Sequence, residues 1–373
     1  MPSPRRPRRT AAPLCLLLLA CAATACGYGS KAAESAPGPQ APVAAVGEEL
    51  SADSVRLGYF PNLTHATALV GVREGLIQKE LGGTTLKTVT FNAGPAEIEA
   101  LNAGSVDIGF IGPSPAVNGY AKSKGENLRI ISGSASGGVK LVVNPARITT
   151  PDDVKGRRIA TPQLGNTQDV AFLHWISARG WKVDATSGKG DVSVVRTDNT
   201  ITPDAYRSGS VDGAWVPEPT ASKLVAEGAR VLLDERDLWP GGTFVITNVI
   251  VSQKFLKAHP DVVEAVLRGT VKTNEWINAD PDRAKASANA ALKSLSGKEL
   301  EAGVIDRAWP GILVTDDPLA ATLRAQAGHA VAAGLLEEPD LTGIYDLGPL
   351  NKVLGSLHKP AVTPGAGTDD QGR

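Results

Sequence analysis

A tetrapeptide, Gly-Ser-Val-Asp, occurs twice in the chain, at residues 104–107 and 209–212. In both places a short apolar run with one aromatic residue follows, and then a loop that contains proline. Glycine favours the end of a helix, a short apolar run favours a buried strand, and proline favours the first turn of the next helix. A chain that builds this unit twice is expected to build two similar α/β lobes, with the two loops at the rim of a cleft between them. Chance recurrence in a glycine-rich α/β protein is the alternative.

The pattern around the repeats indicates an α/β fold with two Rossmann-like lobes. Short apolar runs alternate with helical patterns, which is typical of βαβ units and largely parallel sheets. We expect the first lobe to consist of residues 53–144 and 249–358, the second of these segments being mostly helical. Residues 145–248 would form the second, inserted lobe. Two crossings near Asn144 and Asn248 would then form a hinge.

The first 25 residues have the pattern of an export signal. Four arginines among the first nine residues precede an uncharged apolar run at 11–25. Such a run is too short to span a membrane, and a basic region followed by an apolar one is a secretory signal. The sequence Ala-Thr-Ala-Cys-Gly at 23–27 resembles a bacterial lipobox, in which cleavage exposes a cysteine that carries diacylglycerol.

We expect lipidation at Cys26, because this choice leaves a full-length apolar region upstream. Cys21, and an ordinary signal cleaved after Ala25, are the alternatives. The mature protein would be extracytoplasmic and lipid-anchored to the outer face of the bacterial cell membrane. Residues 26–52, rich in Ala, Gly and Pro, read as a flexible tether, and residues 359–373 as a disordered tail.

Composition excludes several classes of function. The three cysteines all lie at or before Cys26, so the mature chain has no thiol for a disulfide or a metal site. The five histidines are scattered, and no P-loop, dinucleotide fingerprint or nucleophile elbow is present. We therefore expect no metal and no cofactor. Without the four signal arginines, 34 of the 38 basic residues remain against 39 acidic ones, which argues against nucleic acid as a partner.

Loops that follow parallel strands and open helices are where α/β proteins bind ligands. In this chain they are rich in Gly, Asn, Ser, Thr and Gln and contain no Lys or Arg. Helix N-termini add unpaired N–H groups and a partial positive charge, so several of them together can hold an oxyanion such as a sulfonate. The same residues can also serve only as helix caps and turn formers. The candidate ligand-binding residues in these loops are Asn62, Thr64, His65, Asn92, Gly94, Ser114, Gln163, Asn166 and Thr167.

Two further candidate ligand-binding residues, Trp215 and Glu218, have two interpretations each. Trp215 ends a strand and would form an apolar wall for an alkyl chain, or else close the core of its lobe. Glu218 would cap its own helix or bind an amine of the ligand. His65 has no neighbouring carboxylate of the kind that a general base needs, so we expect it to form hydrogen bonds rather than to catalyse.

Several motifs of the chain resemble the aliphatic-sulfonate, taurine and nitrate substrate-binding proteins of ABC importers. The resemblance runs from about residue 55 to 357. It implies a type II periplasmic-binding-protein fold with the ligand held between the lobes. The motifs lie at residues 57–66, 91–101, 107–116, 160–169, 214–219, 234–240 and 343–347.

The resemblance implies a monomeric binding protein that does no chemistry. It would deliver a small organic anion, first of all an aliphatic sulfonate, to an ABC permease and its ATPase subunits, and it would bind by closing its lobes. Nitrate or a thiamine-pyrimidine precursor are alternative ligands. Two other classes stay open: an enzyme, because the same fold resembles a thiamine-pyrimidine synthase and a chorismate-derived dehydratase, and a lipoprotein that senses a ligand for a receptor.

Overall fold

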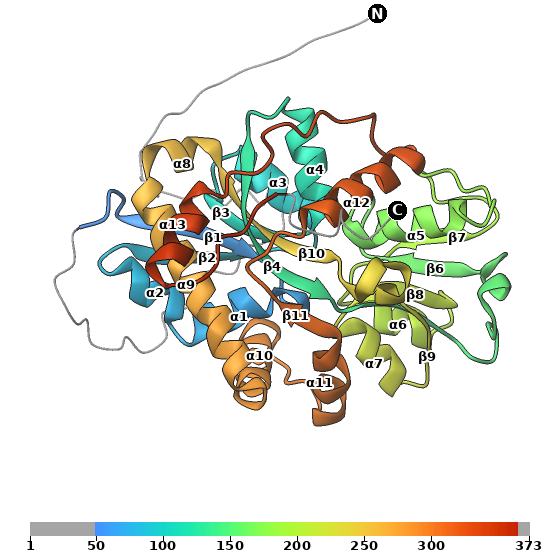
Figure 1. Ribbon diagram of the computed structural model, residues 1–373. Helices are drawn as coiled ribbons and strands as arrows, with labels where there is room; N and C mark the ends of the chain where they lie inside the picture. Colours follow the sequence, from blue (N-terminus) through green and yellow to red (C-terminus); the bar gives the residue numbers. More distant parts are fainter. Residues whose placement is uncertain (1–48, 365–373) are drawn as a thin grey trace, which may run out of the picture. The chain divides into compact units, whose positions relative to one another are not determined.

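A computed structural model describes residues 49–364 of the protein, which form two sheets, each with its own helices (Figure 1). The expected signal peptide and Cys26 lie outside these residues. The first sheet has the order β11-β4-β10-β3-β1-β2 and the second the order β7-β6-β8-β5-β9. The strands of the first sheet are β1 (Ser54–Tyr59), β2 (Thr85–Thr90), β3 (Ile108–Ile111), β4 (Leu128–Gly137), β10 (Val245–Ser252) and β11 (Ile312–Val314). Those of the second sheet are β5 (Val139–Val143), β6 (Arg158–Thr161), β7 (Ser193–Arg196), β8 (Gly213–Pro217) and β9 (Arg230–Asp234).

Most of the helices belong to the lobe of the first sheet, and the segment after β10 is mostly helical, as expected. The helices that precede the second sheet in the chain, or follow it, are α1 (Ala66–Arg73), α2 (Leu76–Leu81), α3 (Gly94–Asn102), α4 (Pro113–Lys122), α8 (Gln253–Ala258), α9 (Pro260–Ala279), α10 (Pro281–Ser296), α11 (Ala302–Ala308), α12 (Ala320–Ala332) and α13 (Gly348–Ser356). The second lobe contains α5 (Thr167–Ser177), α6 (Thr202–Arg207) and α7 (Thr220–Ala226). No helix within residues 49–364 has the length and apolarity that a membrane span requires.

The repeated tetrapeptide has the same structural role in both lobes. In the first, β1 and β3 pair in parallel, and the Asp107 carboxylate accepts a hydrogen bond of 2.8 Å from the backbone N–H of Arg56. In the second, β6 and β8 pair in parallel, and the Asp212 carboxylate accepts one of 3.0 Å from the N–H of Arg158. The side chain of Arg56 also donates to the carbonyl of Gly104, and the side chain of Arg158 donates to the carbonyl of Gly209. The prediction of two similar α/β units is therefore confirmed.

The chain changes sheet at other points than expected. It crosses first at Gly137 and Gly138, whose positive φ angles of 77° and 73° suit glycine, and again within residues 235–244. The expected crossings near Asn144 and Asn248 are wrong, since Asn144 follows β5 of the second sheet and Asn248 lies within β10 of the first. The sheet to which β5 belongs could not be predicted from its apolar sequence. Its antiparallel pairing with β8 and β9 produces no pattern that distinguishes it from a strand of the first sheet. Both sheets contain parallel and antiparallel strand pairs, so the expectation of largely parallel sheets is wrong.

The first lobe extends beyond two of its expected boundaries, into the expected tether and the expected tail. Ser51, expected in the tether, donates from its backbone N–H to the Asp261 carboxylate at 2.6 Å. Val362, expected in the disordered tail, exchanges two hydrogen bonds of 2.9 Å with the side chain of Asn351. Both segments are polar enough to read as linkers, but these specific partners hold them against the first lobe.

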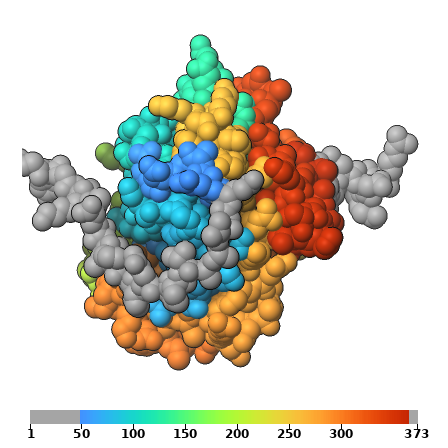
Figure 2. Space-filling model, turned by 90° about the vertical axis from the view of Figure 1, so that its left-hand side faces the viewer, coloured from blue at the N-terminus to red at the C-terminus, as the bar shows by residue number. Residues whose placement is uncertain are grey.

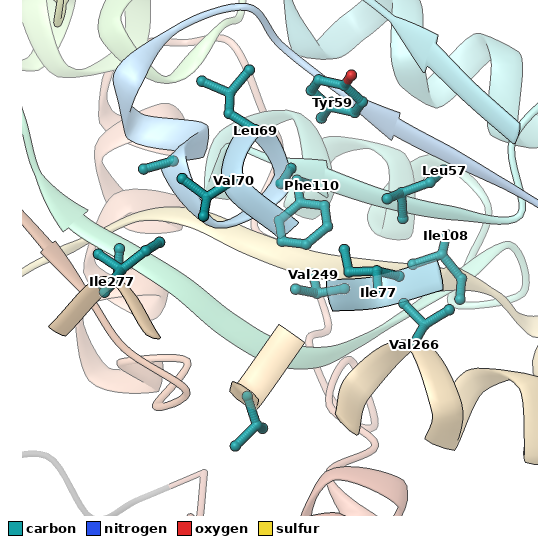
Figure 3. Packing of buried hydrophobic residues seen from close by; sticks show 14 of the residues in the cluster. Leu57, Tyr59, Leu69, Val70, Ile77, Ile108, Phe110, Val249, Val266 and Ile277 are labelled. Atoms are coloured by element: carbon teal, nitrogen blue, oxygen red, sulfur yellow. The ribbon is translucent and has the colours of Figure 1, made fainter. Parts of the chain in front are cut away.

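Each lobe has hydrophobic cores on both faces of its sheet. Figure 3 shows part of the largest core, where Leu57, Phe110 and Val249 from the sheet meet Ile77 of α2 and Val266 of α9. Figure 2 shows the face of this lobe on which segments from the start of the chain, in blue, lie beside segments from its last third, in orange and red. The first lobe is thus discontinuous in sequence, and its two parts are held together by one core.

Candidate ligand-binding site

A cavity lies between the two sheets, where loops at the carboxyl ends of strands from both lobes meet. The space open to the centres of water molecules is about 20 Å³, enough for about one water. The lobes therefore enclose this interlobe cavity closely. Its lining residues are Phe60, Asn62, Thr64, His65, Asn92, Gly112, Asn166, Thr167, Gln168, Asn199, Pro217 and Ile246.

Six of the residues predicted from the sequence line the interlobe cavity, and two more, Gly94 and Ser114, contact a lining residue or follow one closely in the chain. The backbone N–H of Gly94 donates to the side-chain oxygen of Asn166 at 3.4 Å, across the lobes. Ser114 is buried in the first turn of α4, two residues after the lining residue Gly112. Gln163 is not among the lining residues. The six that line the cavity are Asn62, Thr64, His65, Asn92, Asn166 and Thr167.

Sequence reasoning missed Gln168 and Asn199, both of which line the interlobe cavity. Gln168 lies in the first turn of α5, directly after two residues that were predicted. Asn199 lies in the polar turn that follows β7, which has the same composition as the loops that were considered. Both residues could have been predicted from their residue type and from their position after a strand.

Three polar atoms at the cavity are buried and lack a hydrogen-bond partner within residues 49–364. They are the hydroxyl oxygens of Ser114 and Thr167 and the side-chain oxygen of Asn199. Ser114 is 5% exposed and Thr167 is 2% exposed. Leaving a buried polar group unpaired costs about 1–3 kcal/mol, so such groups are usually reserved for a ligand or a bound water.

Two helices begin at the interlobe cavity, one in each lobe. The backbone before α4 and α5 is extended at Gly112 and Asn166, and neither residue caps its own helix with a side chain. The Asn166 amide instead donates to the Gln168 side chain at 2.6 Å. The first N–H groups of α5, and the single N–H of Ser114 between two prolines at the start of α4, are therefore available to an anion, together with the partial positive charge of each helix start.

His65 contributes a neutral donor rather than a cation. Burial lowers the pKa of His65 to about 3, so the imidazole is uncharged at neutral pH. Its Nδ1 accepts a hydrogen bond of 3.3 Å from the backbone N–H of Phe60, so the ring proton is on Nε2. The ring also packs on Phe60, with 4.3 Å between the ring centroids.

A buried ion pair lies beside the site. Glu218, fully buried, pairs with Lys140 at 2.7 Å and accepts a hydrogen bond of 2.9 Å from the N–H of Ser222 in α7. The carboxylate therefore accepts from its own helix, as the helix-capping interpretation expects, and both of its oxygens already have partners. Its carbonyl accepts from the N–H of Leu63 at 2.9 Å, which links the two lobes. Lys140 was missed, although a lysine within the apolar run of β5 is a signal of a buried partner.

Trp215 lies in the core of the second lobe rather than on the cavity wall. It is 0% exposed, and its Nε1 donates to the Glu235 carboxylate at 2.7 Å. Its ring packs on Phe172, with 5.6 Å between centroids. The core interpretation of Trp215 therefore holds, and the apolar lining comes from Phe60 and Ile246 instead. Alternating strand geometry explains the difference, because a residue at a strand end can face either side of the sheet.

Within residues 49–364, no group of three or more His, Cys, Asp or Glu side chains is arranged to hold a metal ion. Two α/β lobes joined by two crossings, with uncharged donors facing a cavity between them, define a periplasmic-binding-protein fold. A family model described as the NMT1-like family matches residues 48–292. The protein belongs to the NMT1-like family.

Known relatives and structures agree with this class. The chain is 28% identical over 218 residues to the taurine-binding periplasmic protein of Escherichia coli, a match that covers 58% of this chain and 64% of that relative. The alkanesulfonate-binding protein SsuA of Xanthomonas axonopodis, solved with bound MOPS, superposes with a TM-score of 0.65 at 23% identity, over 79% of this chain and 98% of that one. The nitrate-binding protein NrtA of Synechocystis gives a TM-score of 0.68 at 15% identity, over 84% and 91%.

Proposed function

We propose that this protein is the extracytoplasmic substrate-binding component of an ABC importer, and that it binds a small organic anion, first of all an aliphatic sulfonate. The observation that carries the proposal is the pair of buried, unpaired hydroxyls of Ser114 and Thr167, which lie at helix starts in opposite lobes. Relatives named for taurine and alkanesulfonate binding support this choice of ligand.

The proposed mechanism is closure of the two lobes around the anion. The N–H and hydroxyl of Ser114 at the start of α4 bind one side of the head group, and the N–H groups and hydroxyl at the start of α5 bind the other. Because both sets are satisfied together only when the lobes are closed, the anion favours the closed state. A hydrogen bond to a charged group contributes about 1.5–3 kcal/mol, so a few of them give useful affinity. The permease would recognise the closed, loaded form.

The charge of the lining favours a monoanion over a dianion. The lining residues include no Lys or Arg, and the nearby Lys140 is paired with Glu218. The cost of moving an ion out of water rises with the square of its charge, and uncharged donors offset that cost for one charge better than for two. Simple alkanesulfonates and nitrate carry a single negative charge at neutral pH, whereas sulfate carries two and taurine adds a positive ammonium group to its sulfonate.

Nitrate is the second candidate, because the enclosed space of about 20 Å³ is small. A sulfonate with an alkyl chain requires the lobes to close less far than they do in this structure. Nitrate, with four non-hydrogen atoms, requires a smaller change. The similarity to a nitrate-binding structure shows that the two proteins share a fold, but it does not identify the ligand of this chain.

Calorimetry of the mature protein against ethanesulfonate, taurine, nitrate, sulfate and a neutral pyrimidine tests the proposal. We expect 1:1 binding of at least one sulfonate, weaker or no binding of sulfate, and little change in affinity between low and high salt, because no ion pair is screened. Binding of nitrate alone would favour the second candidate. Binding of the pyrimidine with no response to any anion would contradict both.

A further inference from the structure

A buried carboxyl group without a partner lies beneath the proposed anion site. Glu97, in the first turn of α3, is 0% exposed. Neither of its carboxyl oxygens has a hydrogen-bond partner within residues 49–364. Nothing in the proposed binding mechanism uses this side chain. A carboxyl group is a costly way to fill a buried space that an alkyl side chain could fill.

Two glycines make room for this carboxyl group. Gly58 of β1 and Gly109 of β3 are direct partners in the parallel ladder of the first sheet. A Cβ at either position would overlap Oε1 of Glu97. Both strands thus lack a side chain where the carboxyl group lies, and together with α3 they form what we call the glycine niche. The niche is a specific accommodation of Glu97 by two separate strands.

No group around the glycine niche compensates a negative charge. Arg56 and Asp107 lie on the same side of the sheet, two residues earlier on each strand, and they pair with each other. The remaining neighbours of the niche are the apolar side chains of Val106 and, from β10, Ile250. Glu99, the other carboxyl group of α3, is exposed. Burial raises the pKa of Glu97 well above its usual range.

The glycine niche is close to the interlobe cavity. Gly58 precedes the lining residue Phe60 by two positions, and Gly109 precedes the lining residue Gly112 by three. A strand rises about 3.3 Å per residue, so the niche lies roughly 7–10 Å below the cavity. At that distance and at the effective dielectric constant of a protein, a negative charge on Glu97 weakens the binding of an anion by about thirtyfold.

We propose that Glu97 is a charge-sensing residue of the anion site: the interlobe cavity binds its anion while Glu97 is a neutral acid, and loses affinity when Glu97 carries a negative charge. By linkage, a bound anion opposes the ionisation of Glu97 to the same extent. The inference rests on the proposed anion-binding function. Beyond that function, anion binding would be coupled to the proton of Glu97, which is not a lining residue of the cavity.

The test compares the wild type with Glu97→Gln, which keeps the shape but cannot ionise, and with Glu99→Gln on the exposed side of α3 as the matched control. Calorimetry with ethanesulfonate, methanesulfonate and nitrate, whose charges do not change in this range, is run from pH 5 to pH 10. The carboxyl resonance of Glu97, assigned in 13C NMR by its loss in Glu97→Gln, locates the pH range in which this group titrates. Glu97→Leu replaces Glu97→Gln if the amide variant does not fold.

We expect the affinity of the wild type and of Glu99→Gln to fall by about thirtyfold as Glu97 ionises, and that of Glu97→Gln to stay level. Near the midpoint, binding by the wild type should also take up a proton, seen as a heat that depends on the buffer. Parallel pH profiles for the wild type and Glu97→Gln, or a Glu97 resonance that does not titrate up to pH 10, would overturn the inference. Failure of all three anions to bind the wild type at any pH would instead contradict the proposed function.

Discussion

The hydroxyl oxygen of Thr167, in the second lobe, lies against the Cα of Gly112 in the first, so closely that a Cβ on Gly112 would overlap it. This contact joins the start of α5 to the start of α4. A residue without a side chain is therefore required at position 112 for the lobes to approach as they do here. Thr167 therefore takes part in this contact between the lobes and also supplies one of the two hydroxyls of the proposed anion site.

Gly112→Ala should block full closure. The added methyl group would hold the starts of α4 and α5 apart, so we expect at least a tenfold loss of affinity for nitrate and a smaller loss for a sulfonate, which needs the lobes to close less far. In small-angle scattering the wild type should become more compact at saturation, and the variant should change less. Gly303→Ala, where a Cβ meets open space, is the control. Equal compaction of Gly112→Ala and the wild type would contradict this account of the contact.

Removing either unpaired hydroxyl should weaken binding without weakening the fold. Thr167→Val and Ser114→Ala each delete one hydrogen bond to a charged group, which corresponds to about 1.5–3 kcal/mol or a ten- to hundredfold loss of affinity. Calorimetry measures the loss, and thermal unfolding checks stability. Thr167→Ser, which keeps the hydroxyl, and Thr90→Val, on an exposed strand position, should bind nearly as the wild type does. Unchanged affinity in both deletion variants would exclude these hydroxyls from the site.

Glu235 should make the free energy of unfolding depend on pH. Burial raises the pKa of Glu235 from its ordinary value of 4.5 to about 7. The folded state therefore holds this proton more tightly than the unfolded state, so the contribution to stability is complete below pH 4.5 and is lost as the pH rises through 7. Its size is on the order of 3 kcal/mol.

Urea unfolding of the wild type and Glu235→Gln at pH 4.5, 6 and 8 measures this effect. The glutamine oxygen can still accept from Trp215, so the variant should gain stability relative to the wild type as the pH rises. Glu337→Gln, at an exposed position, should show no such gain. A constant difference between Glu235→Gln and the wild type across the three pH values would rule out the titration of Glu235.

Cys26→Ala should release the protein from the membrane fraction of an expressing bacterium, because the sequence around Cys26 has the form of a lipobox. Fractionation followed by immunoblotting detects the change, and Cys15→Ala is the matched control. If Cys21→Ala is released while Cys26→Ala stays in the membrane fraction, the lipidated residue is Cys21.

Sequence reasoning found what depends on local pattern. The two units built around Asp107 and Asp212 were predicted because the tetrapeptide, the strand and the loop recur together. The loops that line the cavity were predicted because ligand sites follow parallel strands, and Asn166 and Thr167 are polar residues at a helix start.

What sequence reasoning missed depends on contacts between distant segments. Lys140 and Glu218 are 78 positions apart, so the lysine in β5 signals a buried partner but the sequence does not show that Glu218 is that partner. The glycine niche needs β1, β3 and α3 in register, and in the sequence Glu97 resembles any polar residue of a first helical turn. Trp215 could face the core or the cavity until the register of β8 was known.

The structure of a complex with ethanesulfonate tests the central claim most directly. We expect the sulfonate in the interlobe cavity, with its oxygens within about 3 Å of the hydroxyls of Ser114 and Thr167 and of N–H groups at the starts of α4 and α5. No Lys or Arg side chain should contact it. A sulfonate bound outside the interlobe cavity, or held there by a lysine or arginine, would contradict the account.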